Sequence, residues 1–108
     1  MAKFMLLFIG GEVSDKDRQK NMKEWTDWTT GLVTSVKLID GSPFGEDGKV
    51  LTSKDKMHNY DWHKDSNVGG YAIILAQDLD EATDIAKTCP HFDYKGIVEV
   101  RSLKNIGI

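Results

Sequence analysis

Phe4-Met5-Leu6-Leu7-Phe8-Ile9 and Tyr71-Ala72-Ile73-Ile74-Leu75-Ala76 are the two stretches that decide the fold. Each is an unbroken apolar run of strand length. The glycine pair Gly10-Gly11 ends the first run, and the pair Gly69-Gly70 precedes the second. A run that is apolar at every position is typical of a strand buried on both faces. Both runs are therefore predicted to be central strands of a sheet.

A helix is predicted after each of these runs. Ser14, followed by Asp17 three residues later, opens the first helix in a capping-box-like pattern. Its apolar stripe has helical spacing and consists of Met22, Trp25, Trp28, Thr29, Leu32 and Val33. The second helix starts after the N-cap Asp78, with Glu81 reaching back, and Pro90 stops it. Its buried face is predicted to be Ala82, Ile85 and Ala86.

The remaining segments predict shorter strands. Residues 36–39 are extended until the turn sequence Asp40-Gly41-Ser42-Pro43 breaks them, and residues 49–52 form a short strand. Residues 53–67 are polar and are predicted to be irregular. Residues 97–103 form a last strand that alternates apolar and charged side chains, as an edge strand does.

This order of elements predicts an α+β, ferredoxin-like split βαβ sandwich, with an antiparallel sheet and two helices on one face. In that sheet the first and third main strands are central, which agrees with the two fully apolar runs. Two helices cover only one face, so large apolar side chains on the other face need a second cover. A second copy of the chain provides it by two-fold symmetry, which predicts a homodimer. The alternative is that residues 53–67 fold over that face.

The bulk properties predict one domain over residues 1–108. A net charge of -3 and a pI near 5.5 argue against nucleic acid as a partner. No apolar run approaches the about 20 residues of a membrane helix, and no signal peptide is evident, so the expected location is cytoplasmic. Cys89 is the only cysteine, which leaves no internal disulfide.

His58, Asp61 and His63 are the densest group of titratable side chains. Imidazole exchanges protons near neutral pH and a carboxylate orients it, so the group is a candidate catalytic site for proton transfer. A metal triad is a second interpretation, although strand or helix spacing brings no more than part of the group onto one face. A solvated loop tip is the third.

A ligand pocket is predicted between the first helix and the sheet, for a small apolar or aromatic molecule. Trp25 and Trp28 would line it from the helix, with Asp40, Ser42 and Tyr71 on the strand side. Asp40 would act as a base or Ser42 as a hydrogen-bond donor. The alternatives are that both tryptophans are core residues and that Asp40-Gly41-Ser42-Pro43 is a turn and nothing more. No cofactor and no metal are predicted.

The sequence resembles the YCII-related (DGPF-domain) family over nearly its whole length. The resemblance is carried by the order and spacing of Lys3-Phe4-Met5-Leu6-Leu7-Phe8, Trp25, Trp28, Lys37-Leu38-Ile39-Asp40-Gly41, Lys54-Asp55-Lys56, Gly69-Gly70-Tyr71-Ala72-Ile73-Ile74, Leu79-Asp80-Glu81-Ala82, Ala86-Lys87, Cys89-Pro90 and Val98-Glu99-Val100-Arg101. It implies a dimeric α+β barrel. Some relatives are small-molecule enzymes, including a dehydrochlorinase that acts on an aromatic ring, and others accompany sigma factors.

The sequence departs from two patterns of that family. The family's Asp-Gly-Pro-Phe stretch is expected shortly before Gly69-Gly70, where this chain reads Met57-His58-Asn59-Tyr60-Asp61-Trp62-His63. The histidine that one branch carries in the first helix is replaced by Trp25. The prediction is therefore a homodimeric small-molecule-binding domain. The alternatives are a cofactor-free isomerase or dehydrochlorinase-like lyase that uses a His/Asp pair, and a regulatory protein associated with transcription.

Overall fold

The computed structural model describes residues 1–107. Its main sheet has four strands in the order β2-β5-β1-β6, and a separate two-stranded hairpin is formed by β3 and β4. The elements in chain order are β1 (Ala2–Gly10), the 3-10 helix η1 (Asp15–Asp17), α1 (Arg18–Thr34), β2 (Leu38–Pro43), β3 (Lys49–Ser53), β4 (Lys56–Asn59), β5 (Val68–Ala76), α2 (Leu79–Lys87), the 3-10 helix η2 (Pro90–Tyr94) and β6 (Gly96–Ser102).

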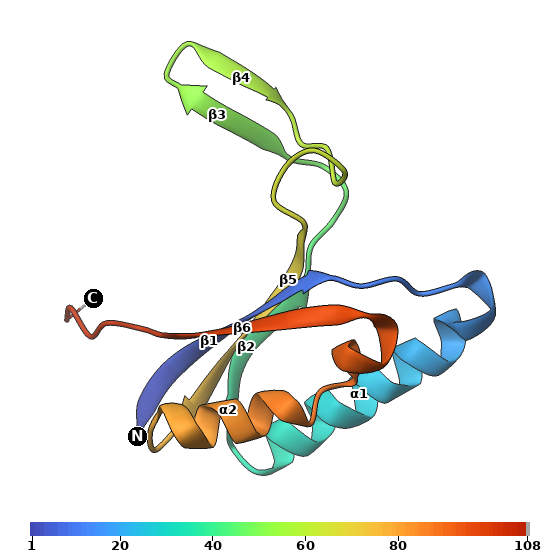
Figure 1. Ribbon diagram of the computed structural model, residues 1–108. Coiled ribbons are helices and arrows are strands. Elements are labelled where there is room, and N and C mark those ends of the chain that lie inside the picture. The colour runs from blue at the N-terminus through green and yellow to red at the C-terminus, as the bar shows by residue number, and fades with distance from the viewer. Residues whose placement is uncertain (108) are drawn as a thin grey trace.

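The topology confirms the predicted ferredoxin-like α+β fold. β1 pairs antiparallel with β5 and with β6, and β2 pairs antiparallel with β5. The two fully apolar strands are therefore central, and the strands with polar positions form the edges. Both helices lie on the same side of the sheet (Figure 1). The opposite side of the sheet is called the open face below.

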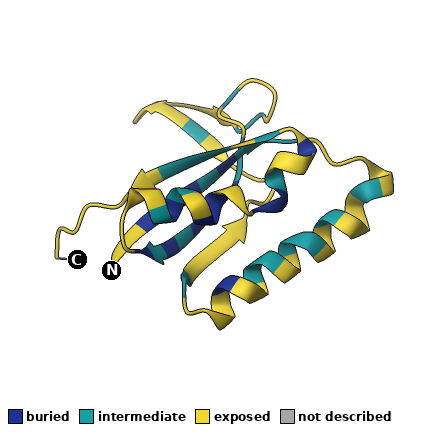
Figure 2. Cartoon of the chain, turned by 60° about the horizontal axis from the view of Figure 1, so that its bottom comes forward, coloured by how far each residue is buried: buried dark blue, intermediate teal, exposed yellow. Residues whose placement is uncertain are grey.

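The core lies between the sheet and the helices, and it follows the alternation of the strands (Figure 2). Phe4, Leu6 and Phe8 of β1 are buried, and Leu6 and Ile74 are completely so. The intervening side chains of β1 and β5 are half-buried on the open face: Met5, Leu7, Ile9, Tyr71, Ile73 and Leu75. The central strands are thus apolar on both faces, as predicted.

Each helix covers the core through a different part of its surface. α2 buries Ala82, Ile85 and Ala86, as predicted. In α1 Leu32 is buried and both tryptophans pack against the core. The predicted stripe is wrong at Met22 and Val33, which are 65% and 57% exposed. Both lie on the flank of the stripe, beyond the arc of α1 that reaches the sheet.

β2 runs through the segment that was predicted to be a turn. Pro43 pairs with Gly70, and the Phe44 N–H donates to the Gly69 carbonyl at 2.8 Å. A Cβ on Gly70 would lie 2.9 Å from the Ser42 carbonyl oxygen, so glycine permits this close pairing. Because β2 is an edge strand, it tolerates a proline that has no N–H to donate.

Residues 53–67 were predicted to be irregular, but they contain β4, which pairs with β3. Leu51 lies opposite Met57, and both are exposed, at 61% and 57%. The hairpin stands away from the sheet on the side opposite the helices in Figure 1 and does not cover the open face. The alternative in which this segment closes that face is therefore wrong.

Hydrogen bonds join η2 to the segment after β1 and to α1. The Glu12 N–H donates to the Tyr94 carbonyl at 2.7 Å. The buried Tyr94 donates its hydroxyl to Glu24 Oε1. This hydrogen bond favours the neutral phenol and raises the pKa of Tyr94 to about 12, with burial acting in the same direction.

The cap of α2 provides a first prediction. Asp78 accepts a hydrogen bond from the Glu81 N–H at 2.9 Å, so Asp78→Ala should lower the free energy of unfolding by about 1 kcal/mol. Asp84→Ala is the matched control, because that exposed side chain makes only a 3.9 Å contact with Lys87. It should change stability by less than about 0.5 kcal/mol. Urea unfolding measures both, and equal losses would contradict the cap.

Tyr94 gives a prediction at alkaline pH. In the unfolded chain the phenol ionises near the ordinary tyrosine pKa of 10.0, whereas in the folded chain the pKa is about 12. The folded state therefore retains a proton that the unfolded state loses, and stability should fall as pH rises from about 10 to about 12. Tyr94→Phe should be less stable than wild type at pH 8, and the gap should shrink by pH 11. A gap in urea unfolding that stays constant would contradict the coupling.

Candidate functional site

A cavity of about 710 Å³ lies between α1 and the sheet, and is called the α1 cavity below. Its floor contains Gly41, Gly70 and Ala72, the helix-facing positions of β2 and β5 at this end of the sheet. Because these side chains are missing or small, they leave the space beneath α1 unfilled. Towards the other end of β5, the fully buried Ile74 fills the same layer. The cavity thus follows from residue size along the strands.

Aromatic rings form the wall of the α1 cavity. Phe8 packs edge-on against Trp25, with ring centroids 4.9 Å apart, and Trp25 against Trp28 at 5.6 Å. The indole N–H of Trp28 donates to Thr88 Oγ1 at 2.8 Å, which fixes that ring. Edge-to-face rings held in this way offer rigid flat surfaces to an apolar ligand. Arg18 and Asn21 of α1 add polar groups to the same lining.

His91 is the imidazole of this cavity, and no sequence motif pointed to it. It lies in η2, and its Nε2 is 2.8 Å from the Ile9 carbonyl oxygen. Its ring centroid is 5.8 Å from that of Phe8 and 6.1 Å from that of Trp25. Nearby glycines make this position possible, because a Cβ on Gly96 would lie 2.1 Å from the ring. Gly11 and Gly96 are therefore the sequence signal, and it is readable only once the register of β1 and β6 is known.

The predicted pocket residues divide between the two faces of the sheet. Trp25, Trp28, Ser42 and Tyr71 border the α1 cavity, whereas Asp40 does not. Because Gly70 and Ala72 face the helices, the alternation directs the Tyr71 side chain to the open face, so it borders the cavity through its backbone. There its hydroxyl donates to Asp40 Oδ2 at 2.9 Å, which raises the pKa of Tyr71.

His58, Asp61 and His63 lie on the hairpin and the turn after it, and none of them borders the α1 cavity. His58 Nε2 is 3.0 Å from Asp65 Oδ1, so the partner of this imidazole is Asp65 and not Asp61. This contact holds the pKa of Asp65 below its usual value. Asp61 Oδ1 instead accepts the backbone N–H of His63 at 2.9 Å. Their catalytic role stays a prediction.

Two other chemistries find little support in the geometry. Within residues 1–107, no three His, Cys, Asp or Glu side chains gather closely enough to hold a metal ion, which leaves the triad interpretation unsupported. Cys89 is buried, and burial raises the pKa of its thiol, so it is a poor nucleophile.

None of the described helices has the length and apolar character needed to cross a membrane.

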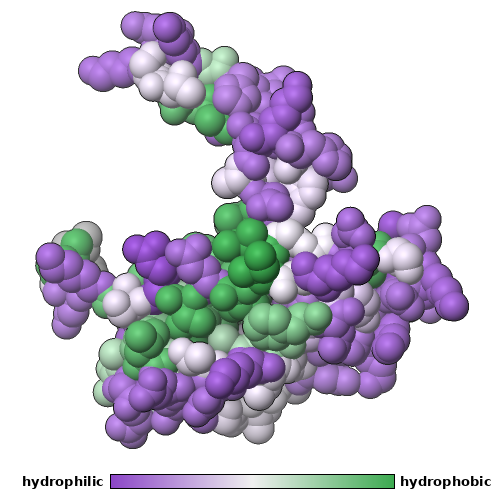
Figure 3. All heavy atoms as spheres, viewed as in Figure 1, coloured by the Kyte–Doolittle hydropathy of each residue, from purple (hydrophilic) through white to green (hydrophobic). Residues whose placement is uncertain are grey.

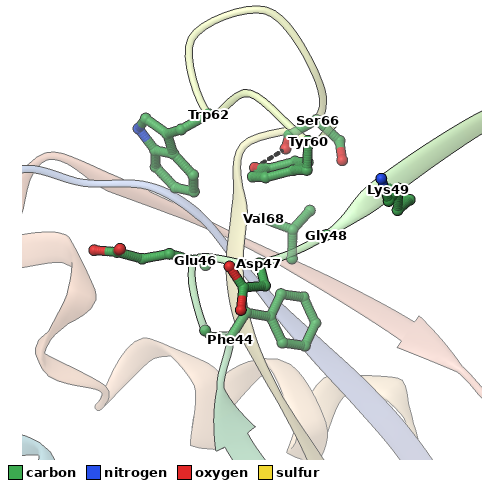
Figure 4. Close-up of a pocket in the computed structure, with 11 residues that line it drawn as sticks. Phe44, Glu46, Asp47, Gly48, Lys49, Tyr60, Trp62, Ser66 and Val68 are labelled. Atoms are coloured by element: carbon green, nitrogen blue, oxygen red, sulfur yellow. Dashed lines mark hydrogen bonds between the residues drawn. The ribbon is translucent and has the colours of Figure 1, made fainter. Parts of the chain in front are cut away.

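A second hollow of about 720 Å³ lies at the base of the hairpin (Figure 4). Phe44, Tyr60 and Trp62 border it together with the carboxylates of Glu46 and Asp47. The Tyr60 hydroxyl donates to the Ser66 carbonyl and so fixes the turn. Most of its lining belongs to exposed residues of the loop after β2 and of the turn after β4.

The comparison with solved structures found a similar chain in 5-chloro-2-hydroxyhydroquinone dehydrochlorinase from Burkholderia phenoliruptrix AC1100, in complex with 2,5-dihydroxybenzoquinone. The two chains are 20% identical, and the match covers 89% of this chain and 90% of that one, with a TM-score of 0.47. The comparison with curated proteins found no match.

The stretch that precedes Gly69-Gly70 in the chain, residues 57–63, lies on β4 and in the turn after it. Pro43 pairs with Gly70, so the end of β2 lies directly beside Gly69-Gly70 in space. That residues 57–63 stand in place of the family's Asp-Gly-Pro-Phe stretch stays a prediction.

The family model of the YCII-related domain matches residues 2–106, which is nearly the whole chain. Its span includes every strand and helix described above. The chain belongs to the YCII-related domain family.

Proposed function

We propose that two copies of this chain form a homodimer and that each copy binds a small aromatic molecule in the α1 cavity. The observation that carries the proposal is the cavity of about 710 Å³ that small residues leave beneath Trp25 and Trp28. Its volume suits a drug-sized or smaller molecule, and its lining combines mainly apolar walls with a few polar groups. That combination is typical of a site that binds one small molecule in a fixed orientation.

The aromatic character of the ligand is argued from the walls. Phe8, Trp25 and Trp28 are mutually edge-on, so more than one ring orientation borders the space. A planar ring can stack on one of them while its edge meets another, which adds to the gain from burial alone. A flexible aliphatic chain would gain burial but not these contacts.

The homodimer is argued from the open face. Met5, Leu7, Ile9 and Ile73 are half-buried there, and Ile97 of the neighbouring β6 is 63% exposed. In Figure 3 apolar residues gather over the strands, below the mostly polar hairpin. Complete burial of an exposed side chain of this size is worth on the order of 1.5–3 kcal/mol, so covering the exposed parts of several half-buried ones is favourable, and a second sheet is the surface of matching shape.

The positions of His58 and His63 favour binding over catalysis by these two residues. A proton-transfer enzyme needs its base within hydrogen-bond reach of the ligand. His58 and His63 lie on the hairpin and in the turn after it and do not border the α1 cavity. A cofactor-free lyase or isomerase that uses His58 or His63 as its base therefore ranks below ligand binding.

Filling the α1 cavity should abolish binding. Thr29 borders the cavity from α1, so Thr29→Trp places a bulky ring in the ligand space. Thr34→Trp is the matched control, since Thr34 is an exposed residue at the end of the same helix. Calorimetric titration with benzoate and with hydroxybenzoates should give heat with wild type and the control but not with Thr29→Trp. Equal binding by all three proteins would contradict the site.

A charge on the open face should separate the dimer. Ile73 lies in the middle of that face, so Ile73→Lys should give a folded monomer. Leu79→Lys introduces the same side chain on the exposed surface of α2 and should leave the dimer intact. Sedimentation should give twice the chain mass of 12.1 kDa for wild type and the control. A monomeric wild type at micromolar concentration would refute the dimer.

A further inference from the structure

We infer that Nδ1 of His91 is a preset hydrogen-bond acceptor in the α1 cavity, and that the ligand is an aromatic acid carrying a ring hydroxyl that donates to it. The inference rests on the proposed function, because it names the ligand class of that cavity.

The contact with Ile9 determines the tautomer of His91. Its Nε2 lies 2.8 Å from the Ile9 carbonyl oxygen, and a carbonyl only accepts hydrogen bonds. Nε2 must therefore carry the hydrogen and donate it. In the neutral ring Nδ1 is then the nitrogen with the free lone pair, so it accepts hydrogen bonds and does not donate them.

The imidazole ring of His91 is held in place by its neighbours. A Cβ on Gly96 would lie 2.1 Å from the ring carbon Cδ2, and a Cβ on Gly11 would lie 2.7 Å from Cε1. The imidazole thus fits where two glycines leave room for it. The rings of Phe8 and Trp25, which also border the α1 cavity, lie beside it with centroid distances of 5.8 and 6.1 Å. An acceptor fixed in this way loses little freedom when a ligand binds, which favours affinity and orientation.

Nδ1 of His91 has no hydrogen-bond partner in the described chain and is open to solvent. Among residues 1–107 it has no hydrogen-bond partner, whereas Nε2 has one. Yet that same part of the chain has no buried side-chain nitrogen or oxygen without a partner. Nδ1 is therefore open to solvent, and His91 borders the α1 cavity. A ligand that displaces this solvent without donating a hydrogen bond would leave the nitrogen unpaired.

The lining of the α1 cavity carries one positively charged side chain. Arg18 is the only Lys, Arg, Asp or Glu residue in the lining of the α1 cavity. Its Nη2 donates to Asp15 Oδ1 at 2.6 Å in an exposed pair, and the guanidinium has further N–H donors that can bind a ligand carboxylate. The lining therefore favours an anion over a cation. Acceptor, cation and aromatic walls together specify a ring with a hydroxyl and a carboxylate. Phenols without an acid group would donate to His91 but would make no ion pair with Arg18.

The test compares benzoate with meta- and para-hydroxybenzoate by calorimetric titration of the full chain. Wild type should bind the better hydroxybenzoate about tenfold more tightly than benzoate, because only the hydroxyl satisfies Nδ1. His91→Phe keeps a ring in this place but removes both ring nitrogens, so the preference should vanish. His63→Phe, on the turn outside the cavity, should retain it.

A measurement on wild type makes the test independent of how the variant folds. The nitrogen-15 resonance of Nδ1 of His91 should shift on adding the hydroxybenzoate and stay nearly unchanged on adding benzoate. Binding of both acids with equal affinity and no Nδ1 shift would overturn the role of His91 but leave the proposed function standing. If none of the acids binds, the proposed function itself fails.

Discussion

The central strands β1 and β5 are apolar on both faces, while both helices of the described chain pack against the same face. This imbalance is the constraint on which the rest depends. On the helix side it produces the core around Leu6 and Ile74. On the open face it leaves a row of half-buried apolar side chains that nothing within residues 1–107 covers. The fold therefore supplies one closed layer and one surface suited to a partner.

The α1 cavity is a local failure of packing that the sequence sets residue by residue. Where Ile74 faces the helices the layer is filled, and where Gly70 and Ala72 face them it is empty. The tryptophans of α1 border this space. The resulting space of about 710 Å³ is the one in which we propose that a small molecule binds.

Sequence patterns predicted the architecture but only part of the site. The runs of β1 and β5, the cap at Asp78 and the stop at Pro90 depend on local chemistry, and the structure has each of them. β4 was missed because an exposed hairpin needs no apolar face, and the end of β2 was missed because glycine and proline also favour turns. His91 could not be found because its role depends on contacts with Ile9 and Gly96, which the fold brings together.

Alternation along β5 keeps the two proposed surfaces apart while joining them through one strand. Gly70 and Ala72 face the α1 cavity, and Tyr71 between them faces the other way, where it donates to Asp40. A larger side chain at Ala72 acts on the cavity, whereas one at Gly70 also disturbs the pairing with β2, because its Cβ would lie 2.9 Å from the Ser42 carbonyl oxygen. A change at Tyr71 acts on the open face and on the pairing of β5 with β2. The proposed ligand site and the proposed dimer surface thus use neighbouring residues of opposite orientation on one strand.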